Sequence, residues 1–448
     1  MIRLILLALL FFSLIPVSEL YSQVINIDSL EVVTQEKEAT PVDLVQAHNR
    51  LSRYYLTNDT TKANYHLLQL DSIASAEVDT NAMFLAGDLK MRKLISKGQY
   101  KEGEAEVRNQ IKLAKALEKD VFIIGSYNAM GVINSILYQN DSALYYFEKS
   151  YQAKLKLEDV KPQDLIGSLN NLGATALKSS LFEEALNYYL ETLERSEKAN
   201  YKKGLGMGHS GLGNVYNKLG EQEKSRFHHL KFLEYAQDIN DLRALGDAHQ
   251  SIGGTFKKEN PDSAIYYFKL ALGNYEQLGD KNHIGLTAMS TGDALINSKQ
   301  PVEALRYFQQ AYDNYVAIGH KRRTIDSESR LAKANFEMGN FNKARSFMDN
   351  VVDYYDNNDE LESSSKAYHL LSKIAEQTGD LELALSSQRK HQLLKDSLDS
   401  ELYNKDVAEI TTKYETSLKD AEIIEQKNKI EKESRLSLIH ISEPTRPY

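Results

Sequence analysis

Apolar residues recur every three or four positions over most of the chain, with polar residues between them. This pattern predicts amphipathic helices rather than strands. One helix is predicted around Asn170 to Leu177 and a second around Phe182 to Tyr189, with a short polar turn between them. Similar turns, rich in Gly, Asn, Asp or Pro, are predicted at 96–100, 219–221, 259–262, 338–340 and 378–380. Gly or Asn can end one helix and Pro or Asp can start the next, so the pattern predicts antiparallel helix pairs.

A unit of two helices is repeated along the chain. In one unit Gly173 is followed by Ala185 after twelve residues and by Tyr189 after four more. The same or a looser order returns at Gly131–Ala143–Phe147, Gly213, Gly253–Ala264–Phe268, Gly292–Ala304–Phe308, Ala332–Ala344 and Ser372–Ala384. The units are spaced by 39 to 42 residues, for example from Gly253 to Gly292 and from Gly131 to Gly173. A fixed period of this length is typical of an α-solenoid.

The small residues are expected where two helices cross, because only Gly, Ala or Ser lets the backbones approach closely. Aromatic pairs on the second helices are expected to pack helix against helix; these are Tyr145–Tyr146, Tyr188–Tyr189, Tyr266–Tyr267 and Tyr354–Tyr355. The unit resembles the tetratricopeptide repeat (TPR), in a form of about 40 residues instead of the common 34. The resemblance covers residues 41–398 and implies an all-α fold: a right-handed superhelix of about nine antiparallel helix pairs.

The N-terminal segment has the pattern of an export signal. Residues 1–22 contain Arg3 and an apolar run from Leu4 to Ile15, which predicts a secretory signal peptide cleaved after Ser22 and a periplasmic protein. The run of about 12 residues is short for a membrane span, although an uncleaved anchor is the alternative. Residues 23–40 are rich in Glu, Asp and Gln, and are expected to be a flexible lead-in.

The C-terminal segment departs from the repeat. Residues 399–435 predict one long polar helix whose apolar positions suit a coiled coil, and therefore a homodimer. The alternative is a helix that caps the last repeat. Residues 436–448 closely resemble a translated sequencing adapter, so they are expected to be non-native, with the true reading frame continuing past Arg435.

Composition and motifs argue against several functions. The chain has 54 Lys and Arg against 63 Asp and Glu, a net charge of -9, which disfavours a nucleic-acid surface. The lack of Cys excludes disulfides, thiolate metal sites and a cysteine nucleophile. The glycine spacing of 206–211 matches a dinucleotide-binding motif, but a charged helix end precedes it where a strand is required. His228 and His229 point about 100° apart on a helix and are expected to be solvated. We therefore expect no enzyme, no cofactor and no metal.

Binding is expected on the concave face that first helices line in this family. The candidates are Asn128, Asn170, Asn171, Ser210, Asn214, Asn217, Gln250, Lys257, Asp293 and Asn297. Most are short amides or hydroxyls that can bond a peptide backbone in either direction. The alternative is that they are ordinary solvent-facing positions. Some family members grip a partner's C-terminal carboxylate with basic residues; Asp247 and Asp326 occupy such groove positions here, which argues against that mode.

A signal peptide, a repeat array and a long helix together resemble the extracytoplasmic part of bacterial sensors, such as TPR-containing histidine kinases or transcriptional regulators. The resemblance implies a periplasmic protein-interaction and signal-input module that binds a peptide or protein. It also implies a transmembrane signalling protein truncated before its membrane span. The alternative is a complete soluble periplasmic scaffold or adaptor.

Overall fold

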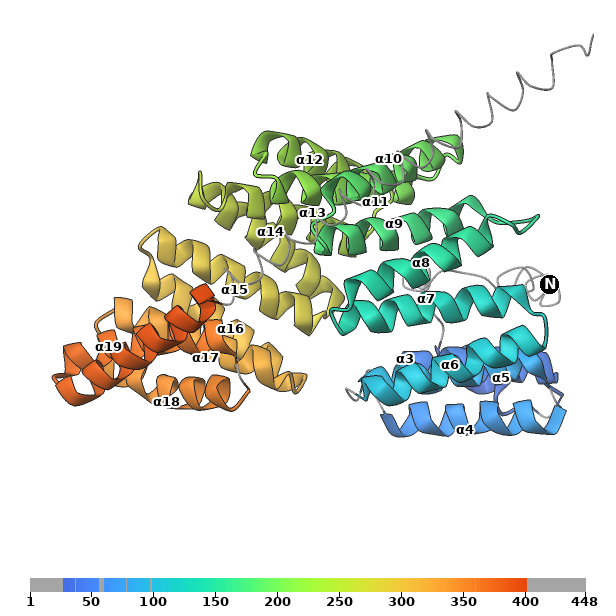
Figure 1. Ribbon diagram of the computed structural model, residues 1–448, viewed down its shortest axis with the longest axis horizontal. Helices are drawn as coiled ribbons and strands as arrows, with labels where there is room; N and C mark the ends of the chain where they lie inside the picture. Colours follow the sequence, from blue (N-terminus) through green and yellow to red (C-terminus); the bar gives the residue numbers. More distant parts are fainter. Residues whose placement is uncertain are drawn as a thin grey trace, which may run out of the picture. The chain divides into compact units, whose positions relative to one another are not determined.

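The structure, a computed structural model, describes residues 27–36, 38–55, 60–77, 79–96, 99–358 and 360–400, and these contain helices and turns but no strand. The helices (Figure 1) are α2 Ile27–Val33, α3 Pro41–Tyr55, α4 Thr60–Glu77, α5 Thr80–Ser96, α6 Tyr100–Ala116, α7 Asp120–Ile136, α8 Asn140–Lys154, α9 Pro162–Lys178, α10 Phe182–Lys198, α11 Lys202–Lys218, α12 Gln222–Asp238, α13 Leu242–Phe256, α14 Pro261–Leu278, α15 Lys281–Asn297, α16 Pro301–Ala317, α17 Lys321–Glu337, α18 Phe341–Asn357 and α19 Leu361–Thr378. Residues 381–400 are also helical. The predicted all-α fold of helix pairs is confirmed.

The helices belong to two compact units, one ending at Asp280 and the other starting at Lys281. In the first unit, α3 to α14 form consecutive pairs in which the odd-numbered helix comes first. In the second unit, α15 pairs with α16 and α17 with α18, and α19 is followed by the helical segment 381–400. We call the odd-numbered helices first helices and their partners second helices.

The predicted small residues lie where the two helices of a pair cross. A Cβ atom added to Gly173 would lie 2.8 Å from Cζ of Tyr189, and one added to Gly292 would lie 2.4 Å from Cε1 of Phe308. Ala185 and Ala304, twelve residues after these glycines, are fully buried. The aromatic ring of the second helix therefore packs directly against the bare backbone of the first helix, as the spacing predicts.

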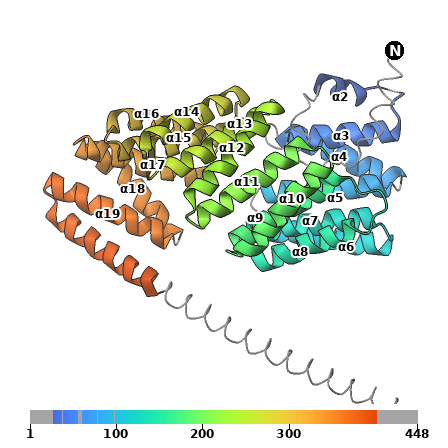
Figure 2. The same ribbon diagram turned by 90° about the horizontal axis from the view of Figure 1, so that it is seen from above.

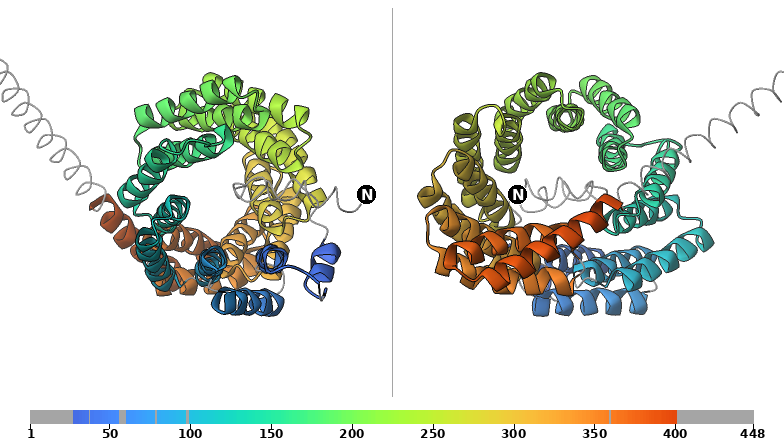
Figure 3. Two further views of the ribbon diagram at one scale, coloured as in Figure 1. Left: turned by 90° about the vertical axis from the view of Figure 1, so that its right-hand side faces the viewer. Right: turned by 60° about the vertical axis from the view of Figure 1, so that its left-hand side comes forward.

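First helices of neighbouring pairs also pack on one another. In the first unit α9 contacts α11 and α11 contacts α13. The rings of Phe84 on α5 and Phe122 on α7 stack with centroids 3.9 Å apart. The first helices consequently form one layer and the second helices another, which Figure 3 shows for the helices of the first unit. Side chains on the exposed side of the first-helix layer are then within reach of those on the next pair.

Most turns within pairs follow the prediction. Gly220, Gly339 and Gly379 have positive φ of 79°, 76° and 81°, which only glycine adopts without strain. At Tyr138 and Ser180 non-glycine residues take the same left-handed conformation, with φ of 57° and 59°. These five turns therefore share one geometry even where the residue is not glycine, whereas the turn between α13 and α14 has no residue with positive φ and begins α14 with the side-chain cap of Asn260.

The expected flexible lead-in over residues 23–40 is wrong for residues 27–33, which form α2 beside α3 (Figure 2). Ile27 and Leu30 pack against Leu51 and Tyr55. The Tyr55 hydroxyl donates to Oε1 of Glu31 at 2.5 Å. An apolar edge and the hydrogen bonds that Glu31 accepts from Tyr55 and Lys62 hold this short helix, and neither gives a clear periodic signal.

The packing role predicted for the tyrosine pairs holds only in part. Tyr189 and Tyr355 are buried, but Tyr145 and Tyr266 are 55% and 60% exposed, so the prediction is wrong for these two. Each of the exposed tyrosines begins a run of three aromatic residues. The second and third residues of the run, such as Tyr146 and Phe147, contact the first helix, whereas the first residue does not pack there.

Some predictions lie outside the described residues: the signal peptide 1–22, residues 401–435 of the long helix, and the tail 436–448. Within the described part of the chain, no helix is long and apolar enough to cross a membrane.

Candidate functional site

Two of the predicted binding residues meet on the first-helix layer. Nδ2 of Asn171 on α9 donates to Oδ1 of Asn128 on α7 at 3.2 Å, and both side chains are half-buried. Two turns further along the same helices, Nζ of Lys178 donates to Oγ of Ser135 at 3.0 Å. We call the four polar residues of these two contacts, which are separated by Val132 and Ala174, the polar strip across α7 and α9.

The remaining candidates of the first unit lie on α9, α11 and α13. Asn170, Ser210, Gln250 and Lys257 are half-buried, whereas Asn214 and Asn217 are exposed. Asn217 accepts a hydrogen bond from Nε2 of Gln222 at 3.2 Å, across the turn to α12. The first unit therefore carries most of the predicted residues on one set of helices.

The second unit holds the other two candidates separately. Asp293 on α15 accepts from Nε of Arg330 on α17 at 3.1 and 3.2 Å, and Asn297 is exposed. The carboxylate of Asp293 thus already has a cationic partner on the neighbouring first helix.

Asp247, for which a groove position was predicted, accepts a hydrogen bond from the second helix of its own pair. Its Oδ1 accepts from the hydroxyl of Tyr275 at 2.6 Å, and Arg243 on the same helix donates to Oδ2 of Asp280 at 2.6 Å. Burial, followed by the charge of Asp247, raises the pKa of Tyr275 well above its usual range. This group joins α13 to α14 and to the residue that precedes the second unit.

Asp326 is buried in an equivalent network, so its predicted groove position is wrong. Oδ1 of Asp326 accepts from the Tyr355 hydroxyl at 2.7 Å, and Arg322 donates to Asp326 and, at 2.8 and 2.6 Å, to Glu360. The hydrogen bonds from Arg322 lower the pKa of Glu360. The same residue types recur about one double repeat after Asp247, and this spacing is the sequence signal that could have identified them as structural.

The prediction that His228 and His229 are solvated is wrong. His229 is 1% exposed and lies under Gly213, where an added Cβ would be 2.5 Å from its Cε1. It fills the position that Tyr189 or Phe308 takes in other pairs, sixteen residues after the glycine. Burial lowers the pKa of His229 to about 4.

His228 faces His209 of α11, with 2.9 Å between their Nδ1 atoms. One ring donates and the other accepts, so at least one of the pair is neutral. Burial, and then the charge of His228, lowers the pKa of His209 to about 4. The two rings lie side by side in the structure and join α11 to α12.

The glycine motif 206–211 lies inside α11, directly after the helix α10. Added Cβ atoms on Gly208 and Gly211 would lie 2.6 Å from Leu193 and 2.1 Å from Tyr189. These glycines therefore permit close helix packing. Among the described residues, no group of three or more His, Asp or Glu side chains is placed to hold a metal ion.

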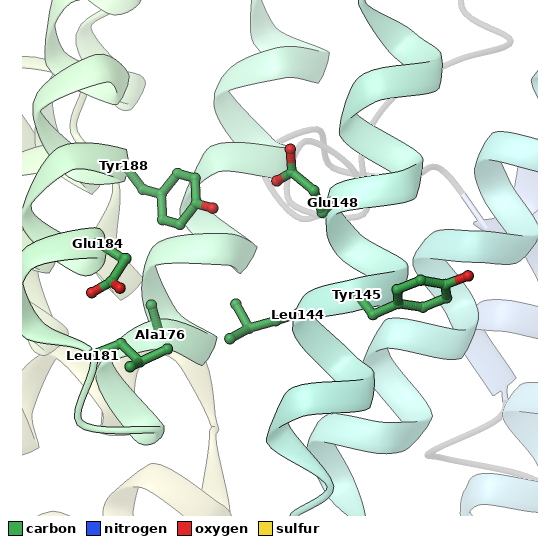
Figure 4. Close-up of a pocket in the computed structure, with 7 residues that line it drawn as sticks. All are labelled: Leu144, Tyr145, Glu148, Ala176, Leu181, Glu184 and Tyr188. Carbon is green, nitrogen blue, oxygen red and sulfur yellow. The ribbon is translucent and has the colours of Figure 1, made fainter. Parts of the chain in front are cut away.

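A pocket that the sequence reasoning missed lies between α8 and α10, beside α9 (Figure 4). Its volume is about 220 Å³, and it is lined by Leu144, Tyr145, Glu148, Ala176, Leu181, Glu184 and Tyr188. Most of these residues are on second helices, where we expected packing only. Residues of two second helices, some 40 positions apart in sequence, come together here because the pairs stack.

Comparisons with known proteins agree with this fold. Residues 165–200 match the tetratricopeptide repeat family. No curated protein matches the chain. Similar solved structures include a signal transduction ATPase with numerous domains (STAND) protein with a tetratricopeptide repeat sensor, from Pyrococcus horikoshii, with a TM-score of 0.56 and 16% identity over 82% of this chain. The chain spans 55% of the length of that protein.

Two Rap proteins are also similar. The apo form of RapI has a TM-score of 0.53 and 13% identity over 80% of this chain and 99% of its own. A Rap protein complexed with Competence and Sporulation Factor has a TM-score of 0.52 and 12% identity, with the same coverage. At such identities the similarity shows the fold alone. The chain is therefore a TPR-like helical repeat protein, with a recognisable tetratricopeptide repeat at residues 165–200.

Proposed function

We propose that this chain is a protein-interaction module that receives a signal by binding an extended peptide, or an extended segment of a partner protein, on the first helices of its first unit. The observation that carries the proposal is the polar strip across α7 and α9, built by Asn128, Asn171, Ser135 and Lys178.

The hydrogen bond between these two asparagines uses Nδ2 of Asn171 as donor and Oδ1 of Asn128 as acceptor. Nδ2 of Asn128 and Oδ1 of Asn171 keep their capacity to donate and to accept. A peptide backbone offers alternating carbonyl and N–H groups. Two side-chain amides that are held in place by a hydrogen bond to each other can form further hydrogen bonds with such a backbone. Pre-ordering of the pair lowers the entropy lost on binding.

The similar structures support a role in signalling. One is a Rap protein in complex with Competence and Sporulation Factor, and another is the quorum sensor NprR from B. thuringiensis, with a TM-score of 0.50 and 16% identity over 79% of this chain. The STAND protein uses its tetratricopeptide repeats as a sensor. Receipt of a signal through a bound peptide or protein is the function that these relatives suggest for the same fold.

The proposed place of action is the periplasm, and the support is the export pattern of Arg3 and the apolar run from Leu4 to Ile15. There the module would serve a membrane-associated signalling protein, with 399–435 pairing two chains. The second candidate function is a soluble periplasmic scaffold or adaptor. We propose no catalytic activity, since the polar groups of the described part serve packing and binding.

Selection from a displayed random-peptide library against the full chain tests the binding proposal, with affinities then measured by fluorescence anisotropy. Asn128→Ala combined with Asn171→Ala should weaken the binding of a selected peptide by about 2 kcal/mol, or roughly 30-fold, because two hydrogen bonds to the peptide are lost. Asn187→Ala is the matched control, because Asn187 is an exposed asparagine on the second helix α10. Equal affinities for the double variant and the control would refute the proposed face.

A fusion of residues 1–40 to alkaline phosphatase tests the location. The proposal predicts phosphatase activity, which develops only after export. An inactive fusion that is nevertheless produced in the cytoplasm would contradict it.

A further inference from the structure

The pocket between α8 and α10 is a second place where a partner can be held, apart from the first-helix strip. Leu144, Ala176 and Leu181 form an apolar side, while Glu148 of α8 and Tyr188 of α10 point toward one another (Figure 4). The ring of Tyr145 is turned away from them, and Nζ of Lys149 lies 5.0 Å from its centroid.

The lining carries two carboxylates and no cation. Oε1 of Glu148 accepts from Nε2 of Gln152 at 2.8 Å, and the carboxylate also interacts with the Tyr188 hydroxyl, while its Oε2 is buried. Glu184 contributes the second carboxylate from the exposed side of the pocket.

The Tyr188 hydroxyl stays neutral beside these acids. Burial, followed by the charge of Glu148, raises the pKa of Tyr188. Its aromatic face borders the same space and can attract a cation. The pocket therefore combines negative charge, an aromatic ring and an aliphatic bed.

We propose that this pocket binds the alkylammonium group of a lysine side chain from a protein partner. The ammonium has three donors and a positive charge that the carboxylates of Glu148 and Glu184 in the lining complement. The methylene stem of the lysine packs along Leu144, Ala176 and Leu181. Tyr188 adds a cation–π contact.

A lysine fits these acceptors better than an arginine. A guanidinium is planar and is bound best by both oxygens of one carboxylate. At Glu148 one oxygen is already occupied by Gln152, so the remaining acceptors are divided between Glu148 and Glu184. A compact charge with rotatable donors matches this arrangement.

The inference goes beyond the proposed function and does not rest on it. The pocket is formed mainly by second helices, whereas the peptide strip lies on α7 and α9 first helices. The pocket proposal and the peptide-binding proposal are tested with different variants, so failure of one proposal can be distinguished from failure of the other.

The experiment is an NMR titration of the full chain with N-acetyl-lysine methylamide, which carries only the ammonium charge. The norleucine counterpart is the neutral control probe, and the free diamine cadaverine is a third probe. Glu148→Gln and Glu184→Gln remove the proposed acceptors one at a time. Glu183→Gln removes the same charge from the neighbouring exposed position in the first turn of α10 and serves as the matched control.

The proposal predicts saturable binding of the lysine probe with shifts at Leu144 and Leu181, at least tenfold weaker binding of the norleucine probe, and about tenfold weaker lysine binding in either acceptor variant. Glu183→Gln should change the lysine affinity less than twofold. Far-UV circular dichroism confirms that each variant is folded.

Equal binding of the lysine and norleucine probes would overturn the proposal, as would equal effects of Glu183→Gln and Glu184→Gln. Cadaverine binding more than tenfold tighter than the lysine probe would assign the pocket to a free diamine and refute the protein-partner assignment.

Discussion

Tyr189 lies between two glycines, and this arrangement gives the sharpest test of how the repeats pack. An added Cβ on Gly173 of α9 would lie 2.8 Å from its Cζ and 2.9 Å from its Cε1. On its other side, an added Cβ on Gly211 of α11 would lie 2.1 Å from the ring. Tyr189 is 3% exposed, so the ring has no free volume into which to move.

Gly173→Ala should therefore destabilise the array. Overpacking costs about 1–3 kcal/mol, and the better helix propensity of alanine returns about 1 kcal/mol, which leaves a net loss of roughly 1 kcal/mol. Gly167→Ala is the matched control, because Gly167 lies in the same helix and an added Cβ there meets nothing within 4 Å. The control should gain up to about 1 kcal/mol from helix propensity.

Urea unfolding of the full chain, followed by far-UV circular dichroism, measures both variants. The predicted gap between the two free energies of unfolding is about 2 kcal/mol. Adding Tyr189→Leu to Gly173→Ala should cost less than Tyr189→Leu alone, because the clash is relieved. If the two alanine variants are stabilised equally, Tyr189 does not pack on Gly173 as described.

Further predictions concern other buried positions. Ala185→Leu and Ala304→Leu should each destabilise the chain by about 1–3 kcal/mol in the same unfolding assay, because both side chains are fully buried; parental stability would refute their placement. His229 has a pKa of about 4 when folded, below its ordinary value of 6.5, so its stabilising effect is present at neutral pH and is lost as the pH falls from 6.5 toward 4. His229→Phe should remove about 2 kcal/mol of the loss between pH 7 and pH 5. Unfolding curves at these two pH values that shift equally with and without the substitution would contradict this. Tyr355→Phe should lower the free energy of unfolding by about 1–2 kcal/mol, because the buried carboxylate of Asp326 loses a donor. Tyr315→Phe should be neutral or stabilising, because the buried Tyr315 hydroxyl has no partner among the described residues. Thermal melts in which Tyr315→Phe is the less stable variant would contradict both descriptions.

The packing of the pairs was predictable because it depends on local spacing. The twelve and four residues that separate Gly173, Ala185 and Tyr189 set the helix crossing, and the structure places all three as expected. The same spacing, applied at Gly213, would also have identified His229 as a core residue. A histidine is often exposed, but the position of His229 in the repeat determines that it is buried.

Other parts of the structure depend on contacts between residues that the repeat spacing does not relate. Helix α2 is held by Leu51 and Tyr55 of α3, and its own seven residues carry little signal. The roles of Asp247 and Asp326 depend on tyrosines 28 and 29 residues away, which become adjacent only when the second helix folds back.

The candidate face was predicted in part. The meeting of Asn128 and Asn171 follows from the stacking of equivalent first helices, but which donors they use could not be read from the sequence. The pocket beside Glu148 was missed because its two sides come from second helices of different pairs.

The most direct test of the account is photo-crosslinking with a benzophenone-labelled peptide from the library selection, with the sites identified by mass spectrometry. The account predicts crosslinks on the first helices α7, α9 and α11, near Asn128, Asn171 and Asn214, and their loss when unlabelled peptide competes. Competed crosslinks confined to the second helices α8, α10 and α12 would contradict it.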